Sequence, residues 1–181
     1  MSNTSIDARL AALSDQQALT ILRSLVGEFA DDETPAKRDD QLEALQAVFD
    51  ASGQAVSTET AGAPTVPDVS DAQRVAAARE LLALLAQLPD VRPSLEEWLA
   101  EPPTQETAAV PLIVIAPLVF TGCIVLLQIA AQTRVHRDKN GRWEIDLDPT
   151  KETSLGKTMT ELVSTVGRLV GAFLPGGGGR G

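Results

Sequence analysis

Residues 107–133, TAAVPLIVIAPLVFTGCIVLLQIAAQT, contain no charged side chain, although charged residues make up 22% of the chain. A helix needs roughly 20 apolar residues to cross the hydrocarbon core of a membrane. Acidic residues precede the run and basic residues follow it. We therefore predict that the apolar segment 108–131 forms a transmembrane helix. Its membrane-embedded residues would include Val110, Ile113, Val119, Ile124 and Leu127.

Two prolines in this run leave other interpretations open. Pro117 would lie inside the predicted helix, where it removes a hydrogen bond, whereas Pro111 fits a first helical turn. One alternative is a pair of buried strands, 110–116 and 118–129, in a soluble α+β domain. Another is a membrane-inserting segment that stays hidden until a trigger acts. We favour the membrane helix because the polar, Ala-rich remainder offers little apolar cover.

The charge of this 181-residue chain is unevenly distributed, and its net value is −10. Residues before Ala108 include 7 Lys or Arg and 19 Asp or Glu, whereas residues after Ala131 include 8 and 6. An acidic surface repels nucleic-acid phosphates, so we expect no nucleic-acid partner. Only 3% of residues are aromatic, and Ala, Leu and Val dominate. This composition predicts a mainly α fold.

The first part of the chain divides into an acidic helical region (1–51), a flexible linker (52–69) and a second helical region (70–107). Capping-box patterns at Ser14–Gln17 and Ser70–Gln73 predict where two of the helices begin. Apolar residues recur at helical spacing behind both patterns. The linker is rich in Ser, Thr, Gly, Ala and Pro and shows no periodicity. We expect these acidic amphipathic helices to bind a protein partner.

Residues 132–174 predict a β-hairpin followed by an amphipathic helix. A three-residue loop, 139–141, with Gly141 left-handed places Val135 opposite Ile145 and makes every cross-strand charge pair opposite in sign. The hairpin also carries a basic cluster directly after the apolar segment. Such a cluster favours the cytoplasmic side and contacts anionic lipid. Its members are Arg134, Arg137, Lys139 and Arg142.

The last helix carries small residues on its polar face. We expect an N-cap at Thr153 or Ser154 and a helix end before Pro175, followed by a disordered Gly-rich tail, 175–181. Small residues at a spacing of four permit close helix–helix approach, so this face predicts homo-oligomer formation. Its members are Gly156, Ser164, Gly167 and Gly171.

No pattern in the chain points to catalysis. His136 and Cys123 are the only residues of their kinds, so they form no metal-ligating set. The run 154–158, SLGKT, has Lys151 where a P-loop requires its first Gly. We expect no cofactor, no metal and no enzymatic activity.

Helices, an apolar segment, the stretch QTRVHRDKNGRWEIDLD at 132–148 and a closing amphipathic helix follow in that order. Over residues 108–173 this order resembles small accessory proteins that are encoded beside the effectors of bacterial conflict systems. The resemblance implies an effector-associated membrane or adaptor component. It transfers no functional residue to this chain.

Together these observations predict a non-enzymatic, membrane-associated adaptor. Its N-terminal helices would bind a protein, and its apolar segment would tether it to the bacterial inner membrane with the C-terminal part cytoplasmic. One alternative is a membrane-perturbing effector that inserts on oligomerisation or cleavage. The other is a soluble α+β interaction module.

Overall fold

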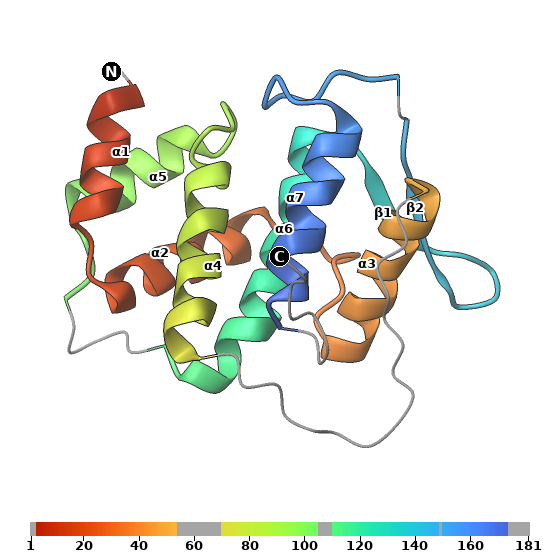
Figure 1. The fold of residues 1–181 in the computed structure, drawn as a ribbon, viewed down its shortest axis with the longest axis horizontal. Coiled ribbons are helices and arrows are strands. Elements are labelled where there is room, and N and C mark those ends of the chain that lie inside the picture. The colour runs from red at the N-terminus through yellow and green to blue at the C-terminus, as the bar shows by residue number, and fades with distance from the viewer. Residues whose placement is uncertain (1–2, 54–69, 105–109, 149, 174–181) are drawn as a thin grey trace, which may run out of the picture.

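The computed structural model describes residues 3–53, 70–104, 110–148 and 150–173. This part of the chain is mainly α-helical, and a two-stranded antiparallel hairpin precedes its last helix, as the sequence predicts (Figure 1). A short 3-10 turn, η1, leads into the sixth helix. The elements are α1 (Asn3–Ala12), α2 (Asp15–Phe29), α3 (Arg38–Ala51), α4 (Asp71–Leu85), α5 (Arg92–Ala100), η1 (Leu112–Val114), α6 (Ile115–Ala130), β1 (Arg134–Arg137), β2 (Trp143–Asp146) and α7 (Met159–Gly171).

Helix α6 is the centre of the fold and contacts α2, α3, α4 and α7 (Figure 1). Its 16 residues span only about 24 Å. Among the described residues, no helix combines the length and the apolarity needed to cross a membrane. The predicted transmembrane helix is therefore wrong, and so is the alternative of two buried strands, because 115–130 is helical.

Burial inside the protein explains why this segment is apolar on every side. A helix that is hydrophobic all round is a core helix when other helices surround it. The remainder of the chain supplies more cover than its composition suggests, because its apolar residues are concentrated in buried stripes on helices that contact α6. Fully buried members of these stripes include Ile21, Leu22, Leu25, Leu45, Phe49, Leu81, Leu85, Leu162 and Val166.

Pro117 lies in the first turn of α6 and not in the helix interior. In that turn the missing N–H of proline leaves no intrahelical hydrogen bond unmade. The helix therefore begins later than predicted. Pro111 instead belongs to the turn before it, where its carbonyl accepts a hydrogen bond from the N–H of Val114 at 2.9 Å.

At Gly122 of α6, side chains of α2 and α4 lie very close to the helix backbone. A Cβ placed there would lie 2.5 Å from Cδ2 of Leu81 and 3.3 Å from Cγ2 of Val26. Both neighbours are buried. A side chain at position 122 would therefore displace packed atoms on two helices.

The N-terminal helices begin where their sequence predicts. Ser14 and Ser70 each form a complete capping box with the Gln three residues later, which confirms both patterns. Arg79 of α4 then ties α1 and α2 to that helix. Its side chain donates to the carboxylate of Asp15 at 2.8 Å and to the Leu13 carbonyl at the end of α1.

The hairpin adopts the predicted register. Arg134 pairs with Asp146, Val135 with Ile145, His136 with Glu144 and Arg137 with Trp143, and Gly141 has a φ of 78°. The turn is closed by Asp138, whose carboxylate accepts the backbone N–H groups of Asn140 and Arg142, each at 2.8 Å. These bonds, chiefly the one from Arg142, lower the pKa of Asp138.

The start of α7 differs from the prediction. Thr158 is the N-cap and accepts the N–H of Glu161, so the expected cap at Thr153 or Ser154 is wrong. Thr153 instead closes a separate turn, in which its hydroxyl donates to the carbonyl of Lys157 at 2.7 Å. Most of the predicted linker (54–69) and the predicted tail lie outside the described residues.

Candidate functional site

The residues predicted to lie in a membrane have two different environments. Val110, Val119, Ile124 and Leu127 are at most 2% exposed, and their surfaces face other parts of this protein. Ile113 alone among the five points outward and is 83% exposed. It lies in η1 beside the exposed residues Pro111 and Val114.

Cys123 lies in the same buried helix. Its complete burial raises the pKa of the thiol to about 12. A thiolate is the nucleophilic form of cysteine, so this side chain is inert in the folded protein.

The predicted self-association face is divided between a loop and a helix. Gly156 precedes α7 and has a φ of 67°, so it does not belong to that helix. Ser164 on α7 is exposed, and Gly167 and Gly171 are half-buried. Self-association through the α7 residues stays a prediction.

The predicted basic cluster lies on the hairpin, but its four members are not equivalent. Arg134, Lys139 and Arg142 are exposed. Arg137 is exposed as well, but it binds a carboxylate of α3, with its Nη2 2.6 Å from Oδ1 of Asp40. Its guanidinium also lies 4.9 Å from the centre of the Trp143 ring, as the predicted register requires. Contact with lipid stays a prediction for the cluster.

The loop between α2 and α3 lies opposite this arginine and has a defined conformation. Thr34 accepts the N–H of Asp31 and donates to its carboxylate at 2.7 Å. Gln41, which is 1% exposed, donates to the carbonyl of Pro35 and to the hydroxyl of Thr121 on α6. The Thr34 hydroxyl also donates to the side-chain oxygen of Gln128 on α6 at 3.4 Å, so the loop backbone is bonded to both α3 and α6.

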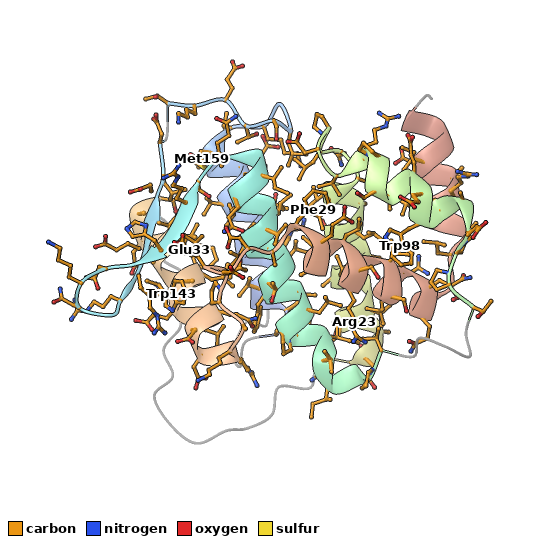
Figure 2. All side chains as sticks on the ribbon, turned by 180° about the vertical axis from the view of Figure 1, so that it is seen from behind. Arg23, Phe29, Glu33, Trp98, Trp143 and Met159 are labelled. Atoms are coloured by element: carbon orange, nitrogen blue, oxygen red, sulfur yellow. The ribbon has the colours of Figure 1, made fainter. Side chains whose placement is uncertain are left out.

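A cleft with a volume of about 510 Å³ separates this loop from the hairpin. In Figure 2 the labels of Glu33 and Trp143 lie close together at the cleft, whereas Trp98 is on the opposite side of the molecule. We call this feature the hairpin cleft. It is lined by Asp32, Glu33, Thr34, Pro35, Ala36, Lys37, Asp40, His136, Arg137 and Trp143.

The charges of the hairpin cleft are divided between its two walls. The loop wall carries the exposed carboxylates of Asp32 and Glu33 and the exposed ammonium of Lys37. On the hairpin wall, Arg137 is neutralised by Asp40. The indole N–H of Trp143 is buried and has no hydrogen-bond partner. The cleft therefore offers an aromatic surface and charges of both signs.

The groups of the hairpin cleft do not resemble a catalytic set. Nε2 of His136 lies 3.6 Å from Glu144 on the outer face of the hairpin, and both side chains are partly or largely exposed. Among the described residues, no three His, Cys, Asp or Glu side chains are grouped to hold a metal ion.

The sequence predicted the exposed turn and the hairpin that form the two walls of this cleft, but it did not predict that they lie side by side. Asp40 and Arg137 are 97 positions apart, and no local pattern connects them. Pro35 and the run of acidic residues indicated only an exposed turn. The one usable signal was the predicted position of Arg137 opposite Trp143, on the face of the hairpin that carries Val135 and Ile145.

Comparisons of the chain with protein-family models, with curated proteins and with solved structures found no match.

Proposed function

We propose that the chain is a non-enzymatic adaptor and that the hairpin cleft is the surface with which it binds a protein partner. The observation that carries this proposal is the junction of Asp40, Arg137 and Trp143 beside an open cleft. Trp and Arg are the residue types that dominate binding energy at protein interfaces. Trp143 is half-buried, and the ion pair with Asp40 restricts the rotamers of Arg137 before a partner arrives, which lowers the entropic cost of binding.

The resemblance to accessory proteins of bacterial conflict systems suggests the first partner to test, an effector encoded beside this chain. The acidic N-terminal part contributes to the surface through residues 31–40, which supply the loop wall and Asp40. The hairpin supplies the other wall. Partner binding by the N-terminal helices, as predicted from the sequence, would thus also require the C-terminal part.

A photo-crosslinking amino acid at Lys37 tests this proposal in the native host. The control position is Glu97, which is exposed on α5 at the opposite end of the molecule from the hairpin (Figure 1). We expect a discrete protein adduct from position 37 and none of the same mass from position 97. Identical adducts from both positions, or none from position 37, would contradict the proposal.

A second candidate function is contact with a membrane surface through η1. The supporting observation is the outward apolar turn, in which Ile113 is 83% exposed and follows the exposed Pro111. Amphipathic segments bind bilayers through buried apolar area and through attraction to anionic lipid. Location at the bacterial inner membrane, with the C-terminal part cytoplasmic, would then depend on peripheral contact.

Flotation with liposomes of anionic phospholipid separates the membrane hypotheses. Peripheral contact predicts that wild type floats, that Ile113→Ser does not, and that entrapped dye stays inside. Dye release by wild type would favour the membrane-perturbing effector. Recovery of wild type in the bottom fraction would contradict the proposed membrane contact and would leave the protein-binding proposal intact.

A further inference from the structure

Polar side chains interrupt the apolar faces of both α3 and α6. On α3, Gln41 is 1% exposed and lies on the same face as the buried residues Leu45 and Val48. On α6, Thr121 and Gln128 are the two polar side chains of an otherwise apolar helix. Because they are seven positions apart, these two residues lie on one face of α6.

These polar residues are bonded to the loop that forms one wall of the hairpin cleft. The side-chain amide of Gln41 donates to the hydroxyl of Thr121 at 2.7 Å and to the carbonyl of Pro35 at 3.1 Å. A second, longer contact of 3.4 Å joins the hydroxyl of Thr34 to Gln128. Thr34 and Pro35 both line the cleft. Both polar side chains of α6 are therefore linked to the loop wall, directly or through Gln41.

The start of α3 lacks the side-chain cap that other helices of this protein have. Its N-cap residue, Lys37, makes no capping hydrogen bond with its side chain, whereas a side chain caps each of α2, α4 and α7. Gln41 acts from inside the helix instead, and its amide also lies 3.4 Å from the carbonyl of Ala36. The path of the chain from the loop into α3 therefore depends on the contacts of Gln41.

Stability alone does not explain a glutamine at this position. The Oε1 atom of Gln41 is buried and has no hydrogen-bond partner within the described part of the chain. A buried polar atom without a partner lowers stability, and a leucine of about the same size would fill the position without that loss. The glutamine therefore destabilises the core while it fixes one loop. A loop that is fixed before a partner arrives lowers the entropic cost of binding.

We propose that Gln41, acting through Thr121, is a positioning residue that holds the loop wall of the hairpin cleft in the shape to which the protein partner binds. This inference rests on the adaptor function and assigns the residues that preorganise its binding site. Neither Gln41 nor Thr121 lines the cleft. Their effect reaches the partner through the backbone of Pro35, whose carbonyl accepts the Gln41 amide.

A pair of substitutions separates positioning from stability. Thr121→Val keeps the shape of the side chain and removes the acceptor of the Gln41 amide. It should lower the urea midpoint of unfolding, because a buried donor loses its partner. Adding Gln41→Leu removes that unpaired amide together with its unpaired oxygen, so the double variant should regain most of the lost stability. The double variant then differs from wild type chiefly in the missing anchor of the loop.

Partner binding should not recover with stability. With the photo-crosslinking amino acid at position 37, the double variant should give roughly tenfold less adduct than wild type in the native host, because the backbone of a loop residue must now be ordered on binding. Hydrogen exchange followed by NMR tests the loop without a partner. The amide of Thr34, which donates to the carbonyl of Asp31 at 3.1 Å, should exchange on the order of tenfold faster in the double variant.

Thr133→Val is the matched control, because it makes the same substitution at another buried threonine. Thr133 is 5% exposed, its hydroxyl has no hydrogen-bond partner among the described residues, and it does not line the hairpin cleft. This substitution removes no anchor of the loop. It should leave both the adduct yield at position 37 and the exchange of the Thr34 amide unchanged.

An adduct yield that returns with the stability of the double variant would show that Gln41 only supports the fold. A double variant that stays as unstable as Thr121→Val would lead to the same conclusion. Unchanged exchange of the Thr34 amide, or an equal loss of adduct in Thr133→Val, would also overturn the inference. In each of these cases the adaptor function stands, because wild type still gives its adduct. Absence of an adduct from wild type would contradict the adaptor function and this inference together.

Discussion

The central helix and the hairpin follow each other directly in the chain, yet sequence reasoning failed at the first and succeeded residue by residue at the second. Helix α6 was expected in a membrane and lies buried among four helices of its own chain. The hairpin has the register predicted from its charges and its turn. The two regions show that a sequence predicts structure well where the determining residues are close together in the chain, and poorly where they are far apart.

The hairpin is determined by residues that are close together in the chain. A left-handed Gly141 sets the loop, and a one-residue slip would place charges on the packed face. Burial of α6 depends on α2, α3 and α4, which lie far from it in the sequence. An apolar run indicates that the segment is shielded from water, but it does not indicate whether lipid or protein shields it.

The largest expected effect comes from truncating the core of α6. Phe120 is fully buried, and its ring meets that of Phe173 edge-on at 5.8 Å. Phe120→Ala should lower the free energy of unfolding by about 4 kcal/mol, measured by urea denaturation. The control is Ile113→Ala in the exposed turn of the same apolar run, which should cost less than about 0.5 kcal/mol. Similar losses of stability in Phe120→Ala and Ile113→Ala would contradict the difference in burial between the two positions.

Close packing around α6 predicts a second, smaller loss. Gly122→Val should cost about 2 kcal/mol, because the new side chain displaces buried Leu81 and Val26. A Cβ added at Gly27 on α2 would meet no atom within 4 Å. Gly27→Val should therefore stay within about 0.5 kcal/mol of wild type in the same denaturation experiment. A tolerated valine at 122 would mean that α6 is not tightly held.

The hairpin should be sensitive at its turn. Gly141 has a φ of 78°, a conformation that costs a residue with a Cβ about 1 kcal/mol. Gly141→Ala should lower stability by that amount and increase amide exchange at Asp138. Lys139→Ala, at an exposed position of the same loop, serves as the control and should change neither measurement. If Gly141→Ala changed neither stability nor amide exchange, the loop would not have the left-handed conformation at position 141.

The smallest effect is expected at a surface pair that joins α4 to α7. Arg168 donates two hydrogen bonds to Glu80, and these lower the pKa of Glu80 below its ordinary value of 4.5. The carboxylate therefore stabilises the fold above pH 4.5, and this contribution disappears as the pH falls through the lower, folded pKa. The Arg168 side chain is largely exposed and that of Glu80 is partly exposed, so the contribution is about 0.5 kcal/mol or less.

Denaturation of wild type and Glu80→Gln from neutral pH to below 4.5 measures this contribution. The stability difference between the two proteins should shrink as the pH falls. A difference that grows on acidification would show that the sign is wrong.

Much of the fold was readable where the signal was local. Both capping boxes, the helical stripes and the hairpin register follow from patterns of a few residues. The start of α6 was misplaced because Pro117 fits a first turn as well as Pro111 does. The hairpin cleft was missed because it joins Asp40 to Arg137 across the whole chain, and charge patterns do not reveal such pairs.

The central position of α6 has a consequence for synthesis on the ribosome. Helices α2, α3 and α4 are made first, but the helix that covers their apolar stripes emerges only after residue 130. Until then the nascent chain exposes those stripes to water, where such surfaces attract chaperones or other unfinished chains. Expression that stops before α6 should therefore give aggregates, however well the individual helices are capped.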